Sequence, residues 1–137
     1  RSLKAARVGG QYLTLSNNAS GGFIKLLGDQ AQGVIVSQVM PASLNFGLVK
    51  EATQLAKAKG VDEVSPAMLE GFASAKVLVE GLRRAGAKPS RASLHQALDN
   101  LGRLDLGGLV LDYSPSDHTG LDFADLSIVG TGGRFRR

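Results

Sequence analysis

The side chains best suited to chemistry in this sequence are few, and their spacing assigns none of them to catalysis. The 137 residues include two histidines, His95 and His118, and no cysteine. Neither histidine has a second ligand at the helical spacing typical of zinc sites, so we expect no metal site and no cofactor. We expect His95 to face solvent on a helix and His118 to lie in a turn.

Motifs of nucleophilic catalysis and of phosphate binding are also missing. No serine lies in the G-x-S-x-G elbow that exposes a nucleophile. The glycine pairs fit neither the dinucleotide fingerprint nor the P-loop, and they separate predicted helices and strands instead. Three carboxylates between Asp112 and Asp122 lack the spacing of a calcium loop, and Asp and Ser are common turn residues. We therefore predict that the chain is not an enzyme.

One loop, at residues 16–20, has the geometry of a binding site. It follows a predicted strand at residues 11–16 and opens a predicted helix at residues 19–27. In open α/β sheets, ligands bind at the carboxyl ends of strands, where hydroxyls, amides and a helix N-terminus can meet a carboxylate. Capping of the helix would explain Ser16, Asn17 and Asn18 equally well, so both roles stay open.

The remaining pattern predicts an α/β protein. A strand at residues 33–39 is apolar on both faces and is expected to be covered on both, and Pro41 follows it. Helices are predicted from 45 to 60, from the Ser65-Pro66 start to 86, and from Ser90 to 102. In the long helix, spacings of three and four predict a buried stripe of Met68, Phe72, Ala75, Val79 and Leu82, widened by Leu69, Ala73 and Leu78. A β-ribbon over residues 109–136, with a polar turn at 114–120, completes the chain.

Composition and charge narrow the class of protein. A hydrophobic fraction of 43% and a charged fraction of 20% are typical of a globular chain, with one domain as the default count. The net charge is +4, but the basic residues are scattered and lack interleaved aromatic rings. Nucleic-acid binding is therefore not expected. No apolar run reaches the ~20 residues that a membrane span needs.

Four segments together resemble a known family. They lie at residues 33–41, 69–82, 105–115 and 117–130, and they follow the family's order between residues 33 and 130. Their order is similar to that in the C-terminal part of the substrate-binding proteins of ABC importers. Within these, it resembles the branched-chain amino acid (Leu/Ile/Val) binding group of type I periplasmic binding proteins.

The resemblance implies part of a two-lobed fold whose lobes are αβα sandwiches, in a fragment that lacks the N-terminal portion. Few strands are available to flank the two early apolar strands, which also favours a fragment. The implied organisation is second lobe at 1–37, hinge crossing at 38–41, first lobe at 42–108, and return crossing with terminal ribbon at 109–137. The return crossing itself is expected near 109–114.

The resemblance also implies a function. The full-length protein would be a receptor with a signal peptide, either periplasmic or exported and membrane-associated. It would capture an amino acid or related small solute by hinge closure and present it to a membrane permease. The rest of the same protein would complete the solute site. The ligand-binding residues expected in this chain are Ser16, Asn17 and Asn18, with a smaller contribution from Gln38 and Met40.

Two other readings of the sequence stay open. One is a compact flavodoxin-like enzyme or sensor domain, which would need its own closed sheet and a phosphate loop. The other is the effector-binding domain of a regulator, which shares the two-lobed fold. The sequence upstream of this chain would separate them, because an export signal favours transport and a helix-turn-helix favours regulation.

Overall fold

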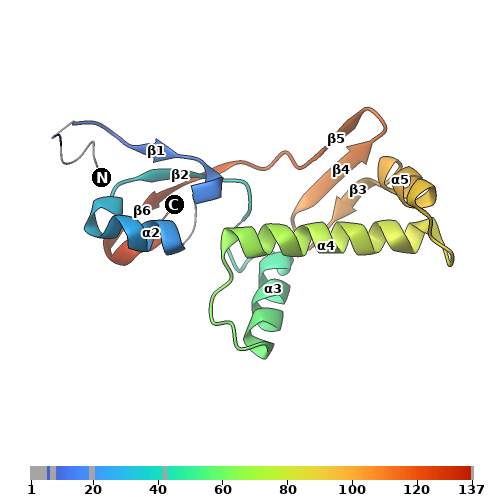
Figure 1. Ribbon diagram of the computed structural model, residues 1–137, viewed down its shortest axis with the longest axis horizontal. Coiled ribbons are helices and arrows are strands. Elements are labelled where there is room, and N and C mark those ends of the chain that lie inside the picture. Colours follow the sequence, from blue (N-terminus) through green and yellow to red (C-terminus); the bar gives the residue numbers. More distant parts are fainter. Residues whose placement is uncertain (1–5, 7–8, 19–20, 42, 137) are drawn as a thin grey trace. The chain divides into compact units, whose positions relative to one another are not determined.

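The computed structural model describes residues 6, 9–18, 21–41 and 43–136 (Figure 1). These residues form two compact units, and each is described by itself. Unit 1 contains the described residues up to Pro41, residues 65–67, and those from Ala124 onward. Unit 2 contains residues 43–64 and 68–123.

The places where the chain changes unit can be compared with the predicted crossings. The chain leaves unit 1 after Pro41, at the end of the segment predicted as a hinge crossing. Apart from residues 65–67, it returns between Phe123 and Ala124, further along than the return expected near residues 109–114. The assignment of these parts to the two lobes of a larger protein stays a prediction.

Unit 1 is built on a four-stranded sheet in the order β1-β2-β6-β7. Its strands are β1 (Leu13–Thr14), β2 (Ile35–Gln38), β6 (Asp125–Val129) and β7 (Phe135–Arg136). β1 runs parallel to β2, and the other neighbours are antiparallel. Helix α2 (Gly21–Leu27) and three short 3-10 turns, η1 (Ser16–Asn18), η2 (Gly28–Ala31) and η3 (Thr131–Gly133), connect and cover the strands.

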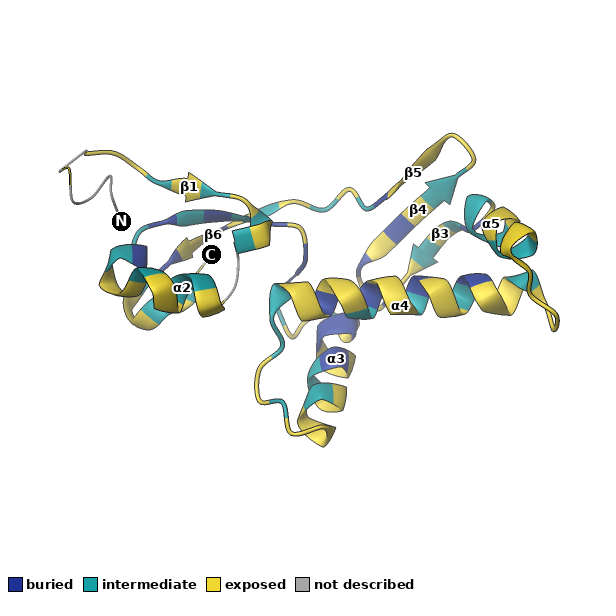
Figure 2. Cartoon of the chain, in the orientation of Figure 1, coloured by how far each residue is buried: buried dark blue, intermediate teal, exposed yellow. Residues whose placement is uncertain are grey.

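The core of unit 1 lies on one face of this sheet. Val34, Val36 and Val129 are buried there with Ala31, and α2 packs against them through Ile24 and Leu27 (Figures 1 and 2). Because successive strand residues point to opposite faces, their neighbours form a second face. On that face Leu13 is 67% exposed, Leu126 59% and Ile128 41%. On β2 itself, Ile35 and Ser37 are half-buried, so the cover expected on both faces of strand 33–39 is only partial in the described chain.

Unit 2 combines helices with a three-stranded antiparallel sheet. Most of α4 (Pro66–Ala85) lies in it, together with α3 (Gly47–Ala58) and α5 (Arg91–Asp99). The sheet has the order β3-β4-β5, with β3 (Gly102–Asp105), β4 (Val110–Ser114) and β5 (Asp117–Gly120). The helix predictions are confirmed to within two or three residues, and α5 begins with the predicted cap. The Ser90 hydroxyl accepts from the Ser93 N–H, and the Ser93 hydroxyl accepts from the Ser90 N–H.

Of the widened stripe predicted for helix α4, only Leu69 and Ala73 are buried. Leu69, Ala73, Val77 and Gly81 are buried, whereas Met68 is 44% exposed, Val79 64% and Leu82 38% (Figure 2). The cause is that α4 is apolar on more than one side, and its narrower stripe contains the small residues. A Cβ placed on Gly81 would lie 2.7 Å from Leu98 Cδ2, so the glycine lets α5 approach closely.

The loop between β3 and β4 joins this sheet to the start of α3. The Asp105 carboxylate accepts from the backbone N–H groups of Gly107 and Gly108, at 2.9 and 2.6 Å. The Gly107 carbonyl in turn accepts from the N–H of Leu48, in the first turn of α3, at 3.2 Å. Gly107 has a φ of 96°, in the left-handed region that favours glycine. One loop thus supplies a partner for an otherwise unpaired helix N–H.

The predicted β-ribbon is divided between the two sheets. β4 pairs with β5, but β6 joins the sheet of unit 1 between β2 and β7. The turn expected at residues 114–120 is shorter, because only residues 115 and 116 form it and residues 117–120 are β5. Among the described residues, no helix is long and apolar enough to cross a membrane.

Candidate functional site

The candidate solute site lies at the carboxyl edge of β1 and β2. These strands are parallel, and Thr14 pairs with Val36. Two residues further along, Ser16 and Gln38 therefore lie at the same edge of the sheet, where both strands end. The Ser16 N–H donates to the Ser37 hydroxyl at 3.1 Å, which ties η1 to the end of β2. The structure thus brings together the two segments that the sequence singled out.

Within η1, the three predicted residues have different partners. The Asn18 carboxamide donates to the Thr14 hydroxyl at 2.8 Å, and the Asn18 N–H donates to the Leu15 carbonyl at 3.0 Å. Asn17 is exposed, and its carboxamide has no hydrogen-bond partner among the described residues. Residues 19 and 20, which directly precede α2, lie outside the described residues. Asn18 therefore stabilises η1, and Asn17 is available for a ligand.

Gln38 and Met40, the other two predicted residues, are both buried. Gln38 is 3% exposed, and its carboxamide forms no hydrogen bond with the described part of the chain. The residue is buried as a whole, but its carboxamide is not enclosed without a partner. Met40 is 7% exposed and carries no polar group. Gln38 thus has a donor and an acceptor at the strand edge, while the roles of both residues stay predictions.

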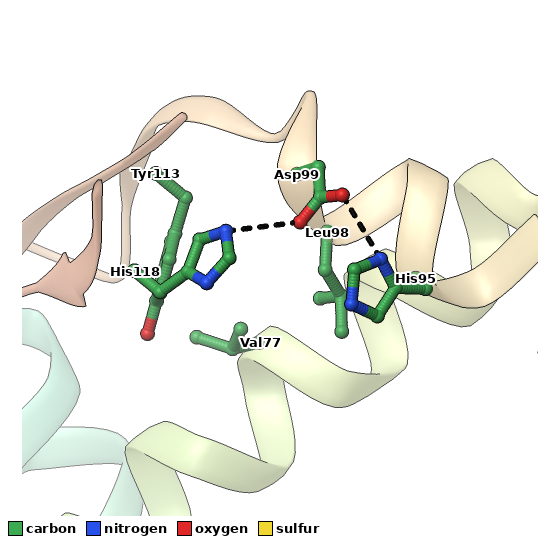
Figure 3. A pocket seen from close by; sticks show the side chains of 6 residues that line it. All are labelled: Val77, His95, Leu98, Asp99, Tyr113 and His118. Carbon is green, nitrogen blue, oxygen red and sulfur yellow. Dashed lines mark ion pairs between the residues drawn. The ribbon is translucent and has the colours of Figure 1, made fainter. Parts of the chain in front are cut away.

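A second group of polar side chains lies in unit 2 around Asp99 (Figure 3). His95 Nδ1 lies 2.9 Å from Asp99 Oδ2, and His118 Nε2 lies 3.1 Å from Asp99 Oδ1. The view of His95 as a histidine without a carboxylate on its own face is wrong, because Asp99 lies four residues further along α5. His118 lies on β5 and not in a turn. The spacing of residues 95 and 99 was a signal that could have found the pair.

The carboxyl group whose pKa is shifted furthest in the described part of the chain is that of Glu80 on α4, in unit 2. Arg83 Nε and Arg84 Nε lie 2.9 and 2.7 Å from its carboxylate oxygens. Their hydrogen bonds lower the pKa of Glu80 to about 2. Arg84 also donates to the Leu101 carbonyl at 2.7 Å, so the cluster links α4 to the end of α5. Its role is structural.

Comparison with known proteins gives a clear structural result. No protein-family model matches the chain, and no curated protein matches it in sequence. A possible leucine/isoleucine/valine-binding protein from Rhodopirellula baltica has a TM-score of 0.89 and 26% identity, over 100% of this chain and 38% of its own. A substrate-binding periplasmic protein from Ralstonia solanacearum has a TM-score of 0.83 and 34% identity, over 98% of this chain and 40% of its own.

A third structure, a branched chain amino acid ABC transporter from Thermus thermophilus with bound valine, has a TM-score of 0.78 and 20% identity. It matches 98% of this chain and 40% of its own, so this chain spans about 40% of the length of such proteins. All three are described as binding proteins or transporter components, and none as an enzyme, as the sequence predicted. The chain therefore has, over nearly its whole length, the fold of a portion of the branched-chain amino acid binding proteins, the type I periplasmic binding proteins of ABC transporters.

Proposed function

We propose that this chain is part of the extracytoplasmic receptor of an ABC importer. The whole protein captures an amino acid or similar small solute by hinge closure and delivers it to a membrane permease without altering it. The observation that carries this proposal is the match to binding proteins over 98 to 100% of the chain, at up to 34% identity. One matched structure holds valine. The proposed location is the periplasm.

The proposed solute contacts in this chain are Ser16, Asn17 and Asn18 with Gln38, and Met40 forms an apolar wall. An amino acid presents an ammonium donor and a carboxylate acceptor. A carboxamide can serve either, because its NH₂ donates and its oxygen accepts. The carboxamides of Asn17 and Gln38 have no partner among the described residues and belong to segments that end at the same sheet edge. The Ser16 to Ser37 hydrogen bond holds those segments together before any solute arrives.

The proposed hinge lies at residues 38–41. The chain changes compact unit directly after Pro41, whose ring fixes φ and limits where bending can occur. The remaining part of the same protein is proposed to supply the other solute contacts. Its existence is supported by the apolar faces that unit 1 and α4 leave exposed, at Leu13, Leu126 and Val79. Such surface is usually covered in a complete protein.

Calorimetric titration of the full binding protein against a panel of amino acids tests the solute site. Asn17→Ala should weaken the best solute about ten- to a hundredfold, because one hydrogen bond to a charged solute group is lost. Asn100→Ala, an exposed carboxamide at the end of α5 in unit 2, is the matched control and should leave the affinity unchanged. If the folded Asn17→Ala variant binds the solute with unchanged affinity, residues 16–18 have only a structural role. If no amino acid or related carboxylate binds the unaltered protein, the proposed solute class is wrong.

A further inference from the structure

The cavity in unit 2 beside Asp99 has a volume of about 220 Å³, whereas the residues proposed for the solute belong to unit 1 (Figure 3). Its lining combines polar and apolar side chains: Val77, His95, Leu98, Asp99, Tyr113 and His118. These come from α4, α5, β4 and β5, all within unit 2. We propose that this cavity is a binding site for a small organic cation, an alkylammonium group carrying a short apolar body.

The hydrogen bonds around Asp99 determine which polar atoms face a ligand. A carboxylate only accepts, so each imidazole must donate an N–H to it: Nδ1–H of His95 and Nε2–H of His118. In a neutral imidazole the other nitrogen then carries a lone pair. His95 Nε2 and His118 Nδ1 have no partner among the described residues. The site therefore offers acceptors: two ring nitrogens and the remaining lone pairs of the carboxylate.

Charge points to the same kind of ligand. With neutral imidazoles, the carboxylate of Asp99 carries a full negative charge next to the cavity. Asp117, adjacent to His118 on β5, lies outside the cavity lining, and its pKa is lowered chiefly by hydrogen bonds from Thr119. No three side chains in the described part of the chain are placed to hold a metal ion together. A donor-rich organic cation therefore suits the site better than an anion or a bare metal ion.

The rest of the lining favours an apolar body on that cation. Val77 is buried on α4, and Leu98 and the Tyr113 ring are half-buried beside it. The two imidazole rings lie edge to face with their centroids 6.4 Å apart, and Figure 3 shows Val77 and Leu98 beside them. Ligand cavities commonly run from ~300 to 1,000 Å³, so this one suits a ligand of only a few heavy atoms. A branched C5 amine has that size and polarity.

The test is an NMR titration of this chain at pH 8, above the range in which imidazole ordinarily titrates. The probes are 3-methylbutylammonium, 3-methylbutan-1-ol and 3-methylbutanoate, which share a carbon skeleton and differ in charge. We expect the ammonium to bind at millimolar concentration and to shift the resonances of His95, His118 and the Val77 methyl groups. The alcohol and the carboxylate should bind at least tenfold more weakly. Equal binding of all three probes, or none by the ammonium, would overturn the proposal without any variant.

Two variants test whether the ammonium probe binds beside Asp99. Asp99→Asn removes the charge and should weaken the ammonium about tenfold or more. Asp112→Asn, an exposed carboxylate on β4 outside the cavity lining, is the matched control and should bind as the unaltered chain does. Unchanged binding by a folded Asp99→Asn would contradict the proposal. Asn17→Ala should leave ammonium binding unchanged, so each of the two proposed sites is tested independently of the other.

Discussion

Unit 1 and unit 2 bury apolar side chains in different ways. Unit 1 rests on one face of a small sheet, with Val36 and Val129 at its centre and the opposite face open. In unit 2, segments pack closely where a glycine has no side chain. Gly107 lies against the backbone at the start of α3, and Gly81 of α4 lies against Leu98 of α5. An interface made by a sheet face can accept a further layer, whereas one made at a glycine has no space for even one methyl group. We therefore expect substitutions on the exposed sheet face of unit 1 to change the free energy of unfolding little. Substitutions at Gly81 and Gly107 of unit 2 should lower it strongly.

Gly107→Ala should have the largest effect and tests the closed contacts of unit 2. The new Cβ would lie 2.7 Å from the Leu48 backbone nitrogen, and the residue would keep a left-handed φ of 96°. Strain and clash together should lower the free energy of unfolding by about 3 kcal/mol, measured by urea denaturation. Gly71→Ala, in α4 with nothing within 4 Å of its Cβ, is the control and should be neutral or raise it by up to about 1 kcal/mol. Equal effects would mean that the β3–β4 loop does not hold α3.

Val36→Ala and Ile35→Ala compare the two faces of the unit 1 sheet. Val36 is fully buried, and losing two buried methyl groups with some cavity should cost about 2 kcal/mol. Ile35 points to the open face and is half-buried, so its truncation should cost about 1 kcal/mol although it removes more atoms. Urea denaturation of both variants measures the difference. A larger loss at Ile35 would show that the open face is covered in solution.

Gln38→Met tests the carboxamide that is proposed to contact the solute. Methionine has a similar shape, so the free energy of unfolding should change by less than about 1.5 kcal/mol. In the full binding protein, the same change should weaken the solute about tenfold in a calorimetric titration. Ser37→Ala, which removes the acceptor of the Ser16 N–H, should lower stability instead. A destabilised Gln38→Met would mean that the carboxamide has a structural partner.

Glu80→Gln should have the smallest effect and concerns the surface of unit 2. The Arg83 and Arg84 hydrogen bonds depress the pKa of Glu80 to about 2 from an ordinary 4.5. A depressed carboxylate pKa stabilises the folded state above the ordinary value, and this stabilisation is lost as pH falls from about 4.5 to about 2. Glu80→Gln should therefore lower stability at pH 7 slightly, and its difference from the unaltered chain should vanish across that window. Glu63→Gln, exposed and without an ion pair among the described residues, is the control.

Helix α4 shows how far the sequence can be interpreted. The Ser65-Pro66 start and the Ala85 end follow from local chemistry, and the structure has both. The buried face does not follow, because Met68, Val79 and Leu82 are spaced as regularly as Leu69, Ala73 and Val77. Periodicity identifies an apolar stripe, but packing partners decide which stripe is buried when there are two. The same limit explains why β2 was expected to be covered on both faces.

The candidate site was accessible to sequence reasoning only in part. Strand ends and loop chemistry place Ser16, Asn17 and Asn18 at a sheet edge, and the register of β1 and β2 agrees. The burial of Gln38 depends on partners far away in sequence and has no local signal. The meeting of His118 with Asp99 is equally long-range, because it needs the β4–β5 hairpin to reach α5. Only the His95–Asp99 half of that cluster could be found from spacing.

The pairing of β2 with β6 has a consequence for the order in which the chain folds. Ile35 pairs with Ile128, so nearly all of unit 2 lies between the two central strands of the unit 1 sheet. Joining such distant segments costs loop-closure entropy before any contact repays it, and that cost falls if the intervening chain is already compact. During synthesis β2 leaves the ribosome long before its partner. Unit 2 should therefore form first, and the sheet of unit 1 should close last, when β6 arrives.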